Sequence, residues 1–208
     1  MNNSLPVWLY LPNIIGYFRF VLIVLGFCIA LDFPILSCLV LVSACLLDML
    51  DGFVARVYKQ TSRLGAMLDY TLDRIMMVGF CFLLAILYPQ FWLIFMFCAT
   101  LDVASHLFHL NASLVQNKTS HKEMTGEKSF LLRLYYCSRL NLTMICLTHD
   151  CFLMFCYLYV FYPGPIIFSL LIVSSLGFVL KTLIHIAQFV RAFESLSQEG
   201  KRENNAVK

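Results

Sequence analysis

Six long apolar segments dominate this chain and limit what it can fold into. They cover about residues 11–31, 35–56, 66–88, 91–113, 140–162 and 166–192. A helix of roughly 20 mainly apolar residues can cross the hydrocarbon core of a bilayer, because it satisfies its own backbone hydrogen bonds there. The sequence therefore predicts an all-α integral membrane protein, built as a bundle of six transmembrane helices.

The composition of the chain supports the same class. Of its 208 residues, 61% are hydrophobic and only 13% are charged, whereas soluble domains average roughly 45–50% and 25%. The net charge of +3 is too small to indicate a nucleic-acid partner. The nine cysteines include no CxxC pair, so neither a disulfide framework nor a zinc site is expected. The stretch MNNSLPVWLY has no basic residue before an apolar core, so we expect no cleaved signal peptide.

Lysine and arginine gather on one side of the expected bundle. They occur between residues 56 and 63, between 118 and 139, and from 191 onward, whereas the connections near 32–34, 88–91 and 162–166 carry none. By the positive-inside rule, both basic loops and both termini are expected in the cytoplasm. We expect a membrane domain over residues 1–193 and a frayed, polar cytoplasmic tail over 194–208.

Four aspartates lie where the second and third apolar segments reach the same membrane boundary. Spacings of three and four residues place Asp48 with Asp51, and Asp69 with Asp73, on one face of each helix. A single aspartate at a helix end is usually a cap or a solvated charge, but two facing pairs repel one another. Mg²⁺ or Mn²⁺ would relieve this repulsion, because both ions prefer carboxylate oxygen. The pattern favours a divalent metal site.

Small and basic residues surround these aspartates. Gly52 and Ala55 let a ligand or another backbone approach the second segment closely, and Gly65 does the same on the third. Arg56 offers a planar donor fork suited to phosphate, and Ser62 adds a hydroxyl group. Together they indicate a diphosphate held between metal ions and an arginine, at the depth of a lipid headgroup.

The spacing Asp48-x-x-Asp51-Gly52-x-x-Ala55-Arg56, followed by Gly65-x-x-x-Asp69-x-x-x-Asp73, resembles the signature of the CDP-alcohol phosphatidyltransferase family. Members of that family are integral membrane enzymes of six helices and are often homodimers. They transfer a phosphatidyl group from a CDP-linked lipid to an alcohol and release CMP. The resemblance thus implies an enzyme, although a transporter or channel remains the alternative from another class. A transporter would spread its acids through the depth of the membrane.

The resemblance also implies roles for individual residues. Asp48, Asp51 and Asp69 would be ligands of Mg²⁺ or Mn²⁺, and Asp73 would be the catalytic general base that also touches a metal. The residues implied to contact the CDP-linked donor lipid are Gly52, Arg56, Ser62 and Gly65.

Further motifs bear on the acceptor alcohol. The stretches LPNIIGYFR (11–19), LDVASHLFHL (101–110) and LRLYYCSR (132–139) resemble eukaryotic members of the family that act on CDP-diacylglycerol and myo-inositol. This resemblance implies the endoplasmic reticulum membrane, with the active site facing the cytosol. Glycerol phosphate, serine or choline is the alternative acceptor. Asn13 and Arg19 could contact the donor lipid or instead bond to other helices.

The acceptor pocket has four candidate residues, which are Asp102, His106, Lys122 and Arg139. The first two share a stripe of one helix with His109, and such a stripe could offer hydrogen bonds to inositol hydroxyls. A polar contact that only fixes helix packing is an equal alternative, and a metal site there is less favoured. The basic pair could hold the acceptor, the diphosphate or anionic headgroups, or could form a solvated loop face.

Overall fold

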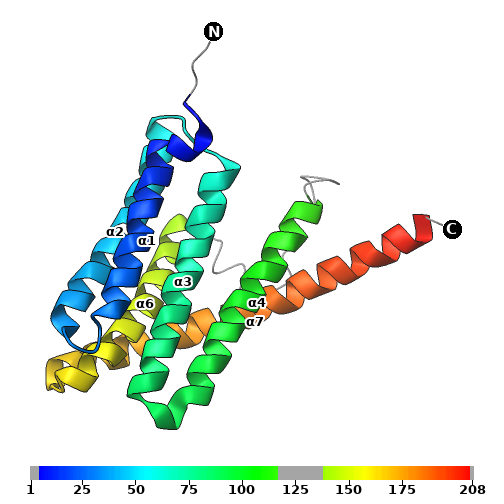
Figure 1. Cartoon of the computed structure of the whole chain (residues 1–208). Coiled ribbons are helices and arrows are strands. Elements are labelled where there is room, and N and C mark those ends of the chain that lie inside the picture. Colours follow the sequence, from blue (N-terminus) through cyan, green and yellow to red (C-terminus); the bar gives the residue numbers. More distant parts are fainter. Residues whose placement is uncertain (1–4, 117–137, 207–208) are drawn as a thin grey trace.

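The computed structural model describes residues 5–116 and 138–206, apart from the side chains of Gln116, Arg139 and residues 203–206, and these residues form helices only (Figure 1). The long helices are α1 (Leu11–Cys28), α2 (Pro34–Val57), α3 (Arg63–Leu87), α4 (Trp92–Gln116), α6 (Arg139–Phe161) and α7 (Pro165–Ala206). Two 3₁₀ turns, η1 (Val7–Leu9) and η2 (Pro89–Phe91), precede α1 and α4.

Within the described ranges, 6 helices are long and apolar enough to cross a membrane. Large apolar side chains are exposed along their outer faces, for example Phe82, Ile166 and Leu176. Such a surface suits lipid rather than water. The predicted all-α fold with six membrane-crossing helices is confirmed, and the chain is a multi-pass membrane protein.

Local sequence signals set where the helices begin. Pro34 and Pro165 occupy the first positions of α2 and α7, where proline is favoured because its missing N–H has no partner there anyway. Ser62 precedes α3, and its Oγ accepts a hydrogen bond from the backbone N–H of Gly65 at 3.0 Å. This cap starts α3 at Arg63, three residues before the predicted start at 66, because the apolar pattern alone does not reveal a capping hydroxyl.

The helices form two groups that meet at α3. Helix α1 packs against α2 and α3, while α4 and α6 both pack against α7, and α3 also contacts α4 and α6 (Figure 1). The Tyr157 hydroxyl of α6 donates a hydrogen bond to the carbonyl of Ala30, between α1 and α2, at 2.7 Å. The Tyr88 hydroxyl donates to the carbonyl of Cys156 at 2.8 Å. These bonds tie the bundle at the end opposite Asp48 and Asp51.

Helix α7 departs from the predicted boundary. It runs for 42 residues to Ala206, so the expected fraying of the tail from residue 194 is wrong up to that point. Glutamate, glutamine, lysine and arginine in this part have high helix propensity, although their polarity had suggested a disordered segment. Glu199 and Arg202, three positions apart, form an ion pair of 3.5 Å along the helix surface.

Candidate active site at the carboxylate cluster

The four predicted aspartates come together around one arginine. Asp48 and Asp51 of α2 and Asp69 and Asp73 of α3 all form ion pairs with the guanidinium group of Arg19, from α1. Nη1 of Arg19 lies 3.0 Å from Asp51 Oδ2 and 3.1 Å from Asp69 Oδ1. Nη2 lies 3.3 Å from Asp73 Oδ1 and also contacts Asp48 Oδ1. We call these five residues the carboxylate cluster.

The carboxylate cluster has excess negative charge and is open on one side. Arg19 is 3% exposed, whereas the side chains of Asp69 and Asp73 are 49% and 43% exposed. One guanidinium neutralises only one of the four carboxylates, so most of the negative charge has no partner within the cluster. A site that is accessible and short of positive charge can accept further cations.

The carboxylate cluster also fits a divalent metal by geometry. One oxygen each from Asp48, Asp51 and Asp69 can be chosen so that all three lie within 4.8 Å of one another. A donor set made only of carboxylate oxygens suits the hard ions Mg²⁺ and Mn²⁺ better than a softer metal. Asp73 is not part of this group of three but contacts the same arginine, with Oδ1 3.3 Å from Arg19 Nη2. The residues present therefore fit the metal that the signature implies.

Close packing of α1 on α3 brings Arg19 to the aspartates. Asn13, Gly16 and Arg19 follow one another at intervals of three on α1, and all three are buried. A Cβ atom on Gly16 would lie 2.6 Å from Leu68 Cδ2, and one on Gly65 would lie 2.8 Å from Asn13 Oδ1. The lack of a side chain at both glycines therefore helps α1 and α3 to approach this closely.

A cavity of about 170 Å³ adjoins the carboxylate cluster and is bordered by Asp51 and Asp69. All four residues predicted to contact the donor lipid line it, namely Gly52, Arg56, Ser62 and Gly65. The Arg56 guanidinium lies over Gly52, since Nη1 would be 3.5 Å from a Cβ atom placed there. The structure therefore joins the two halves of the signature in one cavity.

Sequence reasoning did not select two polar residues among those that line this cavity. Gln60 and Thr61, in the connection between α2 and α3, contribute to its wall. Gln60 Oε1 accepts a hydrogen bond from the backbone N–H of Leu11 at 2.9 Å, which joins this connection to the start of α1. Neither residue has a distinctive spacing, so only the folded chain reveals its position.

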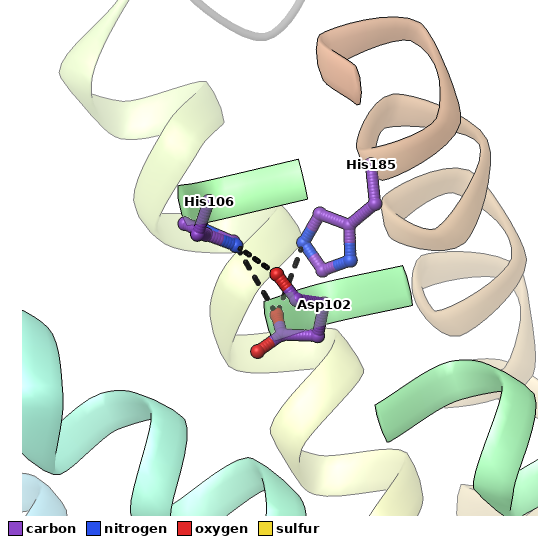
Figure 2. Close-up of side chains that lie close together, drawn as sticks. All are labelled: Asp102, His106 and His185. Carbon is purple, nitrogen blue, oxygen red and sulfur yellow. Dashed lines mark hydrogen bonds and ion pairs between the residues drawn. The ribbon is translucent and has the colours of Figure 1, made fainter. Parts of the chain in front are cut away.

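The acceptor candidates Asp102 and His106 lie in a second ionic cluster, and Figure 2 shows them together with His185. Oδ2 of Asp102 is 2.9 Å from Arg74 Nε of α3, and Oδ1 is 3.5 Å from His185 Nε2 of α7. Nδ1 of His106 is 2.9 Å from the Asp102 carbonyl and 3.4 Å from Oδ1. We call Arg74, Asp102, His106 and His185 the histidine cluster.

The histidine cluster joins three helices rather than lining the cavity. Asp102 is 1% exposed, and neither Asp102 nor His106 borders the cavity beside the aspartates. Asp102, His106 and His185 also offer ligand atoms within 4.8 Å of one another. Arg74 already neutralises Asp102, however, so a cation is favoured less there than at the carboxylate cluster. These contacts match the packing alternative that the sequence left open.

The remaining acceptor candidates cannot be placed in the same way. Lys122 lies outside the described residues, and so does the side chain of Arg139, although its backbone begins α6. The preceding Ser138 caps this helix, because its Oγ accepts a hydrogen bond from the backbone N–H of Asn141 at 3.2 Å. The two basic candidates stay predictions.

Sequence reasoning also missed the contribution of α7. His185 and Lys181 are both buried in this helix, and His185 completes the histidine cluster. The sequence did contain a signal for them. Lys181 and His185 lie four positions apart inside an apolar segment, where ionisable residues usually have a function or pair with another polar group. The sequence could not reveal which acid these residues contact, because the contact joins helices that are far apart in the chain.

Comparison with known proteins places this geometry in a family context. The family model described as CDP-alcohol phosphatidyltransferase matches residues 9–162. The chain is 36% identical to the Saccharomyces cerevisiae protein named CDP-diacylglycerol–inositol 3-phosphatidyltransferase, over 98% of this chain and 96% of that protein. It is 34% identical to the Homo sapiens protein of the same name, over 92% of each chain. No solved structure matches the chain.

Proposed function

Because this chain belongs to the CDP-alcohol phosphatidyltransferase family, we propose that it transfers the phosphatidyl group of CDP-diacylglycerol to myo-inositol, giving phosphatidylinositol and CMP. The observation that carries this proposal is the cavity whose wall contains both the predicted donor-lipid residues and two of the clustered aspartates. The choice of inositol is supported by the names of the relatives, which align with almost the whole chain.

We assign the metal site of this reaction to Asp48, Asp51 and Asp69, with Asp73 as a further ligand, and the metal to Mg²⁺ or Mn²⁺. When bound, the ions neutralise the donor diphosphate and stabilise the charge that develops on phosphorus and on the departing CMP. The carboxylates supply this site from two helices, so its geometry depends on the packing of α2 against its neighbours.

Residues of the cavity bind and orient the donor lipid. Arg56 donates hydrogen bonds to the diphosphate, because its guanidinium presents a planar fork of N–H groups. Gly52 and Gly65 leave room for the CDP moiety beside that arginine. The Ser62 oxygen already accepts the capping hydrogen bond from Gly65, so its hydroxyl hydrogen remains to be donated to the donor lipid.

Asp73 is the general base of the proposed reaction. Its partly exposed carboxylate takes the proton from an inositol hydroxyl, and that oxygen attacks the phosphorus attached to diacylglycerol while CMP leaves. Arg19 holds the carboxylate through a contact of 3.3 Å. A carboxylate is a weak base toward an alcohol, so correct positioning must supply much of the rate.

The acceptor is proposed to enter from the cytosolic side of an enzyme in the endoplasmic reticulum membrane. Candidate contacts are Asp102, His106, Lys122 and Arg139. Of the first two, His106 is the better contact because its side chain is 17% exposed, against 2% for Asp102. We also propose a homodimer, with residues 1–193 in the membrane domain and 194–208 as its polar cytoplasmic extension.

The proposed activity is tested by incubating the purified full-length chain in lipid nanodiscs with CDP-diacylglycerol and Mg²⁺ or Mn²⁺. Labelled myo-inositol, glycerol phosphate, serine and choline are supplied in separate reactions. We expect the label to enter lipid only with inositol, with CMP released in equal amount and only when the divalent ion is present. Incorporation of another alcohol in preference to inositol would contradict the acceptor assignment and leave the transferase chemistry intact.

A further inference from the structure

Arg19 occupies the position in which a cation holds the carboxylate cluster together. Its two terminal nitrogens contact all four aspartates, with distances of 3.0, 3.1 and 3.3 Å to Asp51, Asp69 and Asp73. We infer that Arg19 is an internal counter-ion that competes with the divalent metal for these carboxylates. This inference rests on the proposed metal site and adds a residue of α1 that limits the affinity of the site.

The competition follows from the positions of the charges. Nη1 of Arg19 bridges Asp51 and Asp69, and both carboxylates belong to the group of three that could hold a metal. Mg²⁺ binds carboxylate oxygen at about 2.0–2.1 Å, so an ion on these carboxylates lies only a few ångström from the guanidinium. The two cations repel at that separation, and the burial of Arg19, which is 3% exposed, limits the water that could screen them. Full occupancy of the site by metal therefore requires Arg19 to give up part of its contact with the aspartates.

The burial of Arg19 explains why this counter-ion is present. Without a positive charge, four carboxylates on α2 and α3 would push these helices apart. A guanidinium keeps its charge in any protein environment, and the surrounding acids offset the cost of burying one that is only 3% exposed. Arg19 therefore keeps the cluster assembled before metal binds.

The Arg19 guanidinium can also move. Arg19 Nε is buried and has no hydrogen-bond partner, so the side chain is held through its two terminal nitrogens alone. Contacts through Nη1 and Nη2 can be exchanged for others without breaking a third bond at Nε. This unpaired donor is consistent with a side chain that gives up part of its contact when metal enters.

The experiment that tests this inference measures metal binding rather than turnover. Arg19→Met removes the charge and keeps the length of the side chain. Because no cation then competes for Asp51 and Asp69, we expect the Mn²⁺ dissociation constant to fall by about tenfold or more. We also expect the thermal midpoint of the metal-free variant to fall, and Mn²⁺ to raise that midpoint more than it does in wild type. Electron paramagnetic resonance titration in nanodiscs gives the affinity, and a thermal melt gives the midpoints.

Two further variants serve as controls. Arg63→Met removes an exposed cation at the N-terminus of α3, near the same membrane boundary. It should change the Mn²⁺ dissociation constant by less than about threefold, as expected for a solvated charge. Arg19→Lys keeps the charge but has a single ammonium that reaches fewer carboxylates, so its Mn²⁺ affinity should lie between those of wild type and Arg19→Met.

The possible outcomes separate the inference from the function on which it rests. Unchanged or weaker Mn²⁺ binding by Arg19→Met overturns the competition, while wild-type protein that binds no Mn²⁺ overturns the metal site itself. If Arg19→Met does not fold, the wild-type chain labelled with ¹⁵N-arginine gives the answer by solid-state NMR. The Arg19 guanidinium signal is identified as the one that is missing from the spectrum of Arg19→Lys. In the wild-type spectrum this signal should shift when Mg²⁺ saturates the site, and an unshifted signal would disprove the inference.

Discussion

Two ionic clusters lie on either side of α3 and differ in charge balance and in exposure. The carboxylate cluster combines four acids with one arginine, and the side chains of Asp69 and Asp73 are close to half exposed. The histidine cluster combines one acid with one arginine and two imidazoles, and its acid is almost fully buried. Asp73 and Arg74 are neighbours in sequence, yet each serves a different cluster, because successive residues point about 100° apart around a helix.

We interpret this difference as that between a proposed ligand site and a proposed packing contact. Excess charge at an accessible position is unfavourable in the free protein and becomes favourable only when a cation arrives. A balanced buried pair needs no ligand, but it is sensitive to the loss of either partner, which typically costs about 3–5 kcal/mol. Substitutions in the two clusters should therefore act on different properties.

The largest expected effect is on catalysis, in the carboxylate cluster. Asp51→Ala and Asp69→Ala each remove a proposed metal ligand, as would Asp48→Ala. Transfer to inositol should fall by about 10³-fold, the upper range for losing a group that stabilises developing charge. The thermal midpoint of the metal-free protein should hardly change, since three acids still surround Arg19. Near-normal turnover at ordinary metal concentration would remove that aspartate from the metal site.

A smaller effect on turnover is expected at Asp73, where binding can be separated from chemistry. Asp73→Asn keeps the shape of the side chain but loses the proton acceptor. Turnover should fall by about 10²-fold or more, while CDP-diacylglycerol still binds in the presence of metal. Both quantities are measured on the same preparation. Loss of donor binding in parallel with turnover would instead make Asp73 chiefly a metal ligand.

The smallest effect on turnover, and the largest on stability, is expected in the histidine cluster. Asp102→Leu leaves Arg74, whose side chain is 18% exposed, without its partner, so the free energy of unfolding should fall by up to about 3–5 kcal/mol. The double variant Arg74→Met with Asp102→Leu should recover most of that loss, because no charge is then left unpaired. Thermal or denaturant unfolding in nanodiscs measures both.

Steady-state kinetics on the double variant then tests the acceptor role of Asp102. A KM for inositol that stays near the wild-type value would assign Asp102 to packing alone. A KM that rises while stability is recovered would place it in the acceptor pocket. Failure of the double variant to regain stability would show that the Arg74 contact is not what makes Asp102 important to the fold.

Much of the architecture was predictable because it depends on local pattern. Six apolar segments predicted six helices, and spacings of three and four predicted that each aspartate pair shares a face. The cap at Ser62 and the polar continuation of α7 were missed, because hydropathy alone does not report hydrogen bonding or helix propensity. Element boundaries are accordingly less well determined by sequence than element types are.

Contacts between helices were predictable only where a family signature supplied them. Nothing in the sequence of α1 states that Arg19 meets Asp48 and Asp73, or that His185 meets Asp102. These contacts depend on how closely the helices approach, which is decided by glycines such as Gly16. The sequence could identify the polar residues and left their partners open.

The length of helix α7 has a mechanical consequence. Its 42 residues correspond to about 63 Å at 1.5 Å per residue, roughly twice the thickness of a hydrocarbon core of about 30 Å. In Figure 1 its C-terminal part extends well past α4. Even at a tilt of about 40°, the upper end of the range for transmembrane helices, this helix is longer along the bilayer normal than the hydrocarbon core is thick. Its polar end, which includes Glu199 and Arg202, therefore projects into water as a stiff spacer, and a fluorophore attached near Ala206 would report the tilt of the whole helix.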